Sequence, residues 1–214
     1  MLRFVDITSD KDLLHYQQET AKRLGVHFPL EYLKRSHVVG LRDNKGELQG
    51  GYALVIKGPF RVIDQIPQEV VQNDPELQKK LNKAMEITGL WLDASVRGGM
   101  SRSMLWLNLF FDVLLSGKSH FVYSYDAESK KLGQVYSVCS PSLIYKGPVR
   151  ALEGMKGMAI ECVEIGSIKS CISAFFLRPD FLLKKILVPR RLHMNKVFLK
   201  KAYSQASARS EKVS

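Results

Sequence analysis

The sequence has few cysteines, and the three present are not spaced for a metal site or a set of bridges. Cys139, Cys162 and Cys171 are an odd number, and no two of them form a Cys-x-x-Cys pair. Neither a disulfide framework nor a zinc site is therefore indicated, and a reducing compartment fits this usage. The five histidines are scattered along the chain, so we expect no metal site.

Long apolar runs are also missing. The start, MLRFVDITSDKD, has no apolar signal-peptide core. The longest apolar stretch, Met104 to Leu115, contains Asn108 and Asp112 and is shorter than the roughly 18 residues that a bilayer span requires. We interpret this stretch as a buried helix and expect a cytoplasmic protein.

Three common enzyme signatures are absent as well. The sequence has no Gly-x-x-x-x-Gly-Lys-Ser/Thr run, no Gly-x-Ser-x-Gly elbow and no His-Glu-x-x-His helix. Their absence weakens nucleotide hydrolysis, serine hydrolysis and zinc proteolysis as functions.

What the chain has in excess is positive charge, and this charge is unevenly placed. The net charge is +11, and residues 178–214 hold ten Lys/Arg against two acidic residues, a net charge of +8. We therefore divide the chain into a domain, residues 1–176, and a basic C-terminal tail, residues 177–214. Apolar and basic residues alternate in the tail, which predicts docking on an acidic partner or on an anionic membrane at the inner face. A solvated tail that only adds charge remains the alternative.

Nucleic-acid binding by the tail has little support. Single-stranded nucleic acid is held by aromatic side chains placed among basic ones. Phe198 and Tyr203 alone supply them here. We therefore do not expect a nucleic-acid partner.

The hydrophobic patterns predict a mixture of strands and helices with no internal repeat. Gly25 is placed to end the first helix, residues 43–46 to turn a hairpin, and Pro75 to open a second helix. Strands are expected at 4–7, 37–41, 48–56, 60–63, 86–93, 119–125, 143–145 and 159–165, and helices at 8–24, 75–85, 103–115 and 127–136. After Cys171 the pattern weakens.

The segment from Arg97 to Ser103 carries the chemistry of an anion site. It follows the strongest strand signal, Glu86 to Asp93, and precedes the most apolar helix. The first N–H groups of a helix have no partner within the helix, Gly98 and Gly99 allow close approach, and arginines bind phosphate oxygens. Coenzyme A or a phosphopantetheine arm suits such a site. A plain turn with exposed arginines is the alternative.

The stretch from Thr88 to Leu115 resembles the central motif of the GNAT superfamily of acyltransferases. In that motif a strand is followed by an Arg/Gln-x-x-Gly-x-Gly/Ala turn that grips the pyrophosphate of acyl-coenzyme A. Arg97 takes the first position here, while Met100 and Arg102 stand where the family has small residues. The resemblance covers about residues 1 to 170 and implies an α/β (α+β) fold. The implied sheet is mixed and mostly antiparallel, is flanked by helices, and has parallel, splayed strands around Leu90 and Val122.

The resemblance also implies site residues. Donor-binding residues would be Leu92, Arg97, Gly98, Gly99, Ser101, Arg102 and Ser103. Tyr136 matches the tyrosine that protonates the departing thiolate, although the following Gly-Phe of the family is absent; a packing tyrosine is the alternative. Transfer to an amine needs a base, for which we select Glu86, with an exposed charge at the start of the strand as the alternative. Asp93 is expected to cap the turn.

The opening of the central strand is similar to that of acyl-homoserine-lactone synthases and long-chain N-acyl amino acid synthases. Glu86 and its apolar neighbour match their Glu-hydrophobe-Ser-Arg opening, whereas the Ser-Arg pair is absent. These enzymes draw acyl chains from acyl carrier protein, which favours a fatty-acyl donor. The function expected is N-acyl transfer from acyl-CoA or acyl carrier protein to a small-molecule or peptide amine. The alternative is an inactive GNAT-shaped binding module that acts through its basic tail.

Overall fold

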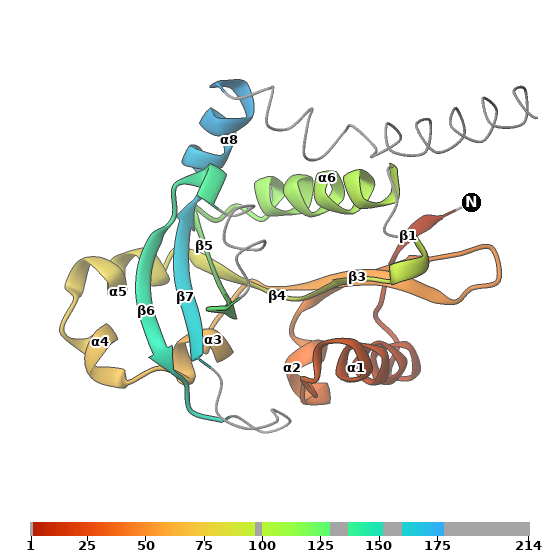
Figure 1. Cartoon of the computed structure of the whole chain (residues 1–214), viewed down its shortest axis with the longest axis horizontal. Helices are drawn as coiled ribbons and strands as arrows, with labels where there is room; N and C mark the ends of the chain where they lie inside the picture. Colours follow the sequence, from red (N-terminus) through yellow and green to blue (C-terminus); the bar gives the residue numbers. More distant parts are fainter. Residues whose placement is uncertain (1, 97–99, 129–136, 152–159, 178–214) are drawn as a thin grey trace, which may run out of the picture.

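A seven-stranded sheet runs through the molecule in the order β1-β2-β3-β4-β5-β7-β6. The computed structural model describes residues 2–96, 100–128, 137–151 and 160–177 (Figure 1). The strands are β1 (Arg3–Asp6), β2 (His37–Arg42), β3 (Leu48–Val55), β4 (Ala84–Leu92), β5 (His120–Asp126), β6 (Ser142–Pro148) and β7 (Ile160–Ser167). Among the strands of the described residues, only β4 and β5 pair in parallel. The expected mixed, mostly antiparallel sheet is confirmed.

Helices cover both faces of this sheet (Figure 1). One face carries α1 (Asp10–Leu24), α2 (Leu30–Lys34) and α3 (Arg61–Asp64), and the other carries α6 (Met100–Leu115) and α8 (Ile168–Leu177). The short helices α4 (Gln68–Gln72) and α5 (Pro75–Leu81) join α3 to β4, and two single 3₁₀ turns are η1 (Ala94–Val96) and η2 (Ser137–Cys139). No helix in the described part of the chain is long and apolar enough to cross a membrane.

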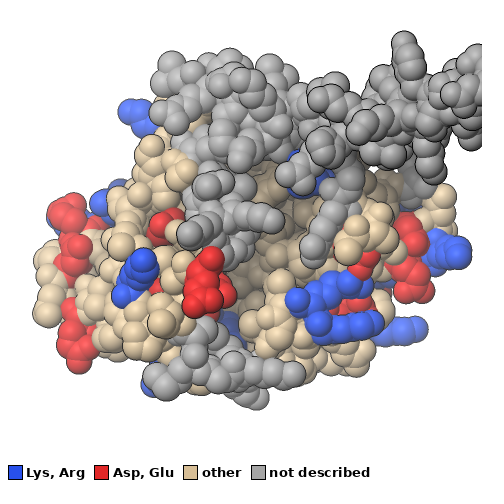
Figure 2. Space-filling model, in the orientation of Figure 1, with Lys and Arg blue, Asp and Glu red and all other residues tan. Residues whose placement is uncertain are grey.

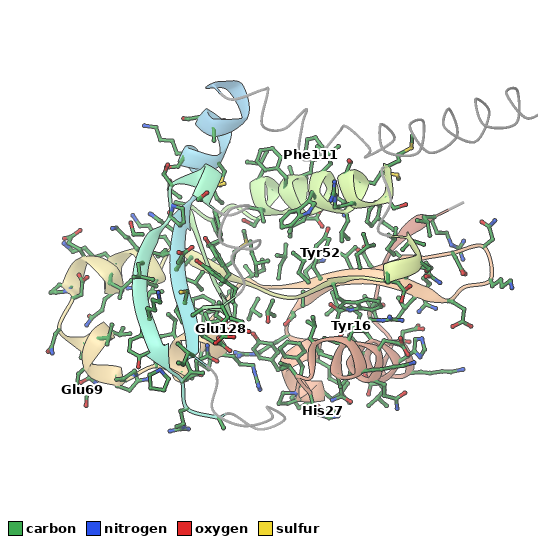
Figure 3. All side chains as sticks on the ribbon, viewed as in Figure 1. Tyr16, His27, Tyr52, Glu69, Phe111 and Glu128 are labelled. Atoms are coloured by element: carbon green, nitrogen blue, oxygen red, sulfur yellow. A yellow bond between two sulfur atoms is a disulfide. The ribbon has the colours of Figure 1, made fainter. Side chains whose placement is uncertain are left out.

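The two faces bury separate apolar clusters. Tyr16 lies in the cluster under α1 to α3 and Tyr52 in the cluster under α6, and Figure 3 shows them on opposite sides of the sheet. Both tyrosines are fully buried. Residues of β4 alternate between the clusters, with Ala84 in the first and Met85 and Ile87 in the second. Side chains of the central strand β4 therefore pack on one face of the sheet or on the other.

Local sequence signals fix several boundaries, among them the helix end expected at Gly25 and the turn expected at residues 43–46. Ser9 accepts a hydrogen bond from the Asp12 N–H at 3.1 Å and caps α1, which ends where Gly25 takes a left-handed conformation (φ 71°). Gly46 has a φ of 86° in the turn of the β2–β3 hairpin. Asp74 caps α5 by accepting from the Leu77 N–H at 2.9 Å.

Three expectations about elements were wrong. Residues 60–63 form the start of α3 rather than a strand, because a short apolar run does not distinguish a strand from a helix turn. The helix expected at 75–85 ends at Leu81, since Ala84 and Met85 join the sheet. Residues 168–177 form α8, although no element was expected there and the pattern weakens after Cys171. The helix expected at 127–136 lies mostly outside the described residues.

Candidate functional site

The parallel strands β4 and β5 separate shortly after they begin. They pair at Ala84 with His120, Met85 with Phe121 and Glu86 with Val122, and at no later position described. From Ile87 to Leu92 the edge of β4 that faces β5 therefore has no partner in the described residues. Figure 2 shows a hollow in the middle of the face that looks onto this fork. The expectation of adjacent, parallel and splayed strands is confirmed.

A bulge in β4 bends the strand at the fork. Gly51 pairs with Trp91 and Ala53 with Thr88, so that Gly89 and Leu90 together oppose Tyr52. Gly89 has a φ of 60°, and its carbonyl accepts a hydrogen bond from the Tyr16 hydroxyl at 2.8 Å. A Cβ on Gly89 would lie 3.0 Å from that hydroxyl oxygen. Bulges of this kind redirect a strand beside functional sites.

The turn after β4 is capped by Asp93. Its carboxylate accepts from the Ser95 N–H at 2.8 Å and from the Ser95 hydroxyl at 2.6 Å, and it forms an ion pair with Arg23. These contacts, with Ser95 first, hold the pKa of Asp93 below its ordinary value. Asp93 therefore has the capping position expected for it.

The donor-binding residues expected from the sequence fall on this turn and the helix after it. Leu92 is the last residue of β4, and Ser101, Arg102 and Ser103 lie in the first turn of α6. Arg97, Gly98 and Gly99 lie outside the described residues. In the sequence, the N-terminus of α6 thus lies eight residues after the end of β4.

Glu86 lies at the point of the fork, on the face covered by α2 and α3. Its side chain is fully buried, and neither carboxylate oxygen makes a hydrogen bond of good geometry with a residue in the described ranges. Burial raises the pKa of Glu86 to about 7, while the nearby Tyr32 hydroxyl and the backbone N–H groups of Arg61 and Val62 favour its charged form. The expected alternative, an exposed charge, was wrong, because Glu86 faces the first apolar cluster. A buried carboxyl that titrates near neutrality can exchange protons with a substrate.

Tyr32 lies next to Glu86 at the point of the fork. Its hydroxyl is also buried, and its ring lies under the guanidinium groups of Arg35, at 5.0 Å, and Arg61, at 5.5 Å. Burial and the charge of Glu86 raise the pKa of Tyr32, so its hydroxyl stays protonated. The side of the fork at Glu86 therefore combines one ionisable carboxyl group with one neutral hydroxyl group.

The opposite face of the fork carries polar residues that the sequence did not single out. The hydroxyls of Tyr123 and Tyr125 on β5 both donate to the carboxylate of Glu164 on β7, at 2.6 and 2.9 Å. Burial, followed by the bond to Glu164, raises the pKa of Tyr125. The spacing Tyr-x-Tyr does predict a shared face of a strand, but nothing in the sequence indicates that β7 pairs beside it.

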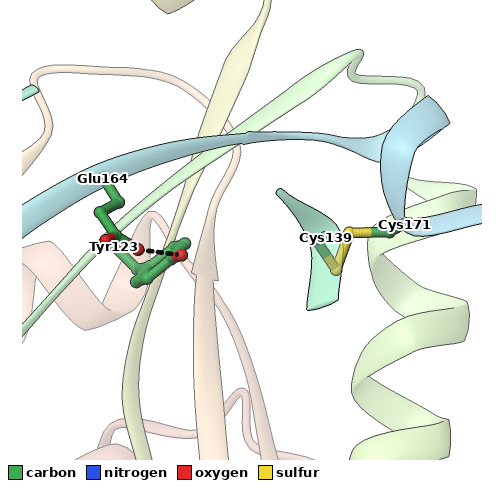
Figure 4. The surroundings of a disulfide bond; sticks show 4 residues. All are labelled: Tyr123, Cys139, Glu164 and Cys171. Carbon is green, nitrogen blue, oxygen red and sulfur yellow. Dashed lines mark hydrogen bonds between the residues drawn. A yellow bond between two sulfur atoms is a disulfide. The ribbon is translucent and has the colours of Figure 1, made fainter. Parts of the chain in front are cut away.

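Tyr136, the expected thiolate acid, lies outside the described residues. The chain after it forms η2, where Cys139 is joined by a disulfide to Cys171 of α8, close to Tyr123 and Glu164 (Figure 4). The expectation of no disulfide was wrong, because two cysteines 32 residues apart in the sequence meet only through the packing of α8. Cys162 is free and buried.

Comparisons with known proteins identify the fold. No family model and no curated protein matches the sequence. Among solved structures, FeeM, an N-acyl amino acid synthase from uncultured soil microbes, matches with a TM-score of 0.57 and 13% identity, over 81% of this chain and 94% of that chain. Arabidopsis thaliana NAA60 in complex with acetyl-CoA matches with a TM-score of 0.55 and 12% identity, over 79% and 99%. The fold is thus shared at low sequence identity.

Proposed function

We propose that this chain, which has the GNAT fold, is an N-acyltransferase that moves an acyl group from a thioester to an amine. The observation that carries the proposal is the fork between β4 and β5, which opens beside the N-terminus of α6 and has a buried carboxyl at its point. An extended arm with amide groups can add to the free edge of β4 as a further strand would. A diphosphate suits the α6 N-terminus. The likeness to FeeM, an N-acyl amino acid synthase, and to NAA60 in complex with acetyl-CoA supports the reaction class.

The donor is a coenzyme A thioester or an acyl group on the phosphopantetheine of acyl carrier protein. Leu92, at the end of β4, and Ser101, Arg102 and Ser103, in the first turn of α6, are proposed to hold it together with Arg97, Gly98 and Gly99 of the preceding turn. Arg102 supplies a positive charge for phosphate oxygens. The acceptor is a small-molecule or peptide amine.

Glu86 is proposed as the base. The amine nitrogen attacks the thioester carbonyl carbon, its proton passes to Glu86, and the C–S bond breaks as the tetrahedral intermediate collapses. The thiolate then takes a proton from Tyr136. A carboxyl with a pKa near 7 is half ionised at neutral pH, which suits a base that must first accept a proton and then release it.

The test is the formation of N-acyl products by the full chain from acetyl-, octanoyl- and palmitoyl-coenzyme A with a panel of amines, followed by mass spectrometry. We expect product with at least one donor, and an Arg97→Ala variant that binds coenzyme A about 10- to 100-fold more weakly. The variant Glu86→Gln removes the proposed base. Its matched control is Glu31→Gln, which changes an exposed glutamate on α2. If the chain forms no product and calorimetry detects no binding of coenzyme A, the proposal is refuted.

One observation favours the alternative, a binding module that has lost catalysis. Met100, at the first position of α6, is 77% exposed where the family has glycine, and Arg102 stands where it has another small residue. Binding of coenzyme A without any product would support that alternative.

A further inference from the structure

A cavity lies at the end of the sheet where the parallel strands β4 and β5 begin. Its volume of about 330 Å³ is within the range of small-molecule sites. The loop from β3 to α3, the end of α5 and the loop before β5 enclose it, and α5 leads directly into β4 (Figure 1). We call it the lysine pocket, because Lys57 and Lys118 both line it. It is distinct from the fork, which opens only beyond the pairing of Glu86 with Val122.

The inner wall of the lysine pocket is apolar. It consists of the side chains of Ile56, Phe60, Ile63, Leu81 and Ala84. Phe60, Ile63 and Ala84 are buried members of the apolar cluster under α1 to α3, so the packing of the core holds this wall in place. A wall of this kind takes an apolar body out of water without having to rearrange.

The rest of the lining is polar and mainly donates hydrogen bonds. Lys57 and Asn82 are exposed, and Lys118 is half-buried. Neither lysine forms an ion pair with a residue that the structure describes. Two ammonium groups and one side-chain amide are therefore available to donate to a ligand that enters the pocket.

Asp64 is the one acid among the described residues that line the lysine pocket. Partial burial raises the pKa of Asp64, and the charges of Arg35, Arg150 and Arg61 act in the opposite direction. Three arginines thus lie close enough to favour its carboxylate. Because these arginines offset the charge of Asp64, that charge does not cancel the two lysines.

Further positive charge lies around the end of α5. Burial, followed by the charges of Lys80 and Lys83, lowers the pKa of His120 at the start of β5. Lys79, the other lysine of α5, is paired with Glu76 at 2.6 Å and adds no net charge. Together with the two lysines of the lining, Lys80 and Lys83 make this end of the sheet attractive to an anion.

From these observations we propose that the lysine pocket binds a small organic anion, a carboxylate with a short apolar body. The two carboxylate oxygens accept hydrogen bonds from Lys57, Lys118 and Asn82, and the body lies against the apolar wall. The proposal does not depend on acyl transfer, because the pocket and its charges lie apart from the fork.

The test is a titration of the isotope-labelled full chain with hexanoate, followed by the amide chemical shifts. We expect changes at residues 56–64, 81–84 and 118, and binding at least about 10-fold tighter than that of acetate, whose body is shorter. The double variant Lys57→Gln, Lys118→Gln should bind hexanoate about 10- to 100-fold more weakly. Its matched control is Lys11→Gln, Lys45→Gln, which changes two exposed lysines outside the lining and should bind as the wild type does.

Four results would overturn the proposal. The first is the absence of any shift change at millimolar hexanoate, and the second is a set of changes confined to residues 87–92, which would place the probe in the fork. The third is equal binding by the double lysine variant and its control, with circular dichroism verifying that both fold. The fourth is binding of hexylamine or of inorganic phosphate as tight as that of hexanoate, because Asp64 or bare positive charge would then account for recognition.

Discussion

Glu86 places a carboxyl group in an apolar layer, and its charge then depends on pH close to neutrality. If Glu86 is the base, only the ionised fraction of the enzyme can start the reaction. We expect kcat/KM to rise about tenfold per pH unit below pH 7 and to level off above it. The measurement is a pH–rate profile of the wild type and of Glu31→Gln as control. A Glu86→Gln variant with the wild-type profile would exclude Glu86 as the base.

The same carboxyl makes folding sensitive to pH. In the unfolded chain Glu86 ionises near 4.5, whereas the folded protein keeps its proton until about pH 7. Between these values the folded state binds more protons, so the contribution of Glu86 to the free energy of unfolding falls as pH rises from 4.5 to 7 and is constant above that. The change is on the order of 3 kcal/mol.

Urea unfolding of the wild type and Glu86→Gln at pH 4 and pH 8 measures this difference. We expect the wild type to lose stability relative to the variant on going to pH 8, because glutamine cannot ionise. A difference between the two proteins that is the same at both pH values would mean that Glu86 keeps an ordinary pKa in the folded state.

Among the elements, β4 carries the bulge that shapes the fork, and Gly89 is the residue that permits it. Gly89→Ala should lower the free energy of unfolding by about 1–3 kcal/mol, because alanine disfavours a positive φ and its Cβ would press on the Tyr16 hydroxyl. Gly46→Ala is the matched control, since Gly46 also has a positive φ but open space around it. Denaturant unfolding of both variants separates the two effects, and equal losses would show that the contact with Tyr16 costs nothing.

Elements with a strong local signal could be predicted from the sequence. Gly25, Gly46 and Pro75 each act on the backbone of the few residues around them, and the structure has the helix end, the hairpin turn and the helix start where they were expected. The prediction of a strand at residues 60–63 was wrong because contacts distant in the sequence set their helical state. The N–H groups of Arg61 and Val62 lie beside Glu86. Local chemistry therefore predicts where elements begin and end better than it predicts short elements held by tertiary contacts.

The candidate site divides in the same way. The sequence indicated Glu86 and the turn before α6, because strand and turn are continuous in the chain. It did not indicate the group formed by Tyr123, Tyr125 and Glu164, or the pairing of Cys139 with Cys171, because these join β5 to β7 and η2 to α8. Contacts between strands that are distant in the sequence leave no spacing to recognise.

At the scale of the whole molecule, the Cys139–Cys171 disulfide links the chain beside the fork to the last described helix. Closing a loop of this length restricts the unfolded chain, so the oxidised protein should be more stable than the reduced one by about 2–4 kcal/mol. Unfolding with and without a reductant measures the effect, and Cys139→Ser should be insensitive to the reductant. Alkylation of three thiols in protein unfolded without a reductant would contradict the bridge.

The order of strands in the sheet has a consequence for how the chain is built. Strands β1 to β4 lie side by side in the order in which they occur, whereas β5 joins them through three residue pairs. Contacts between segments close in sequence form with less loss of chain entropy than those between distant ones. Residues 3–92 should therefore gain amide protection before residues 120–167 in pulsed hydrogen exchange during refolding, and simultaneous protection would argue against this order. On the ribosome, four strands of the sheet are complete before β5 is synthesised, and the fork does not exist until β5 has followed them.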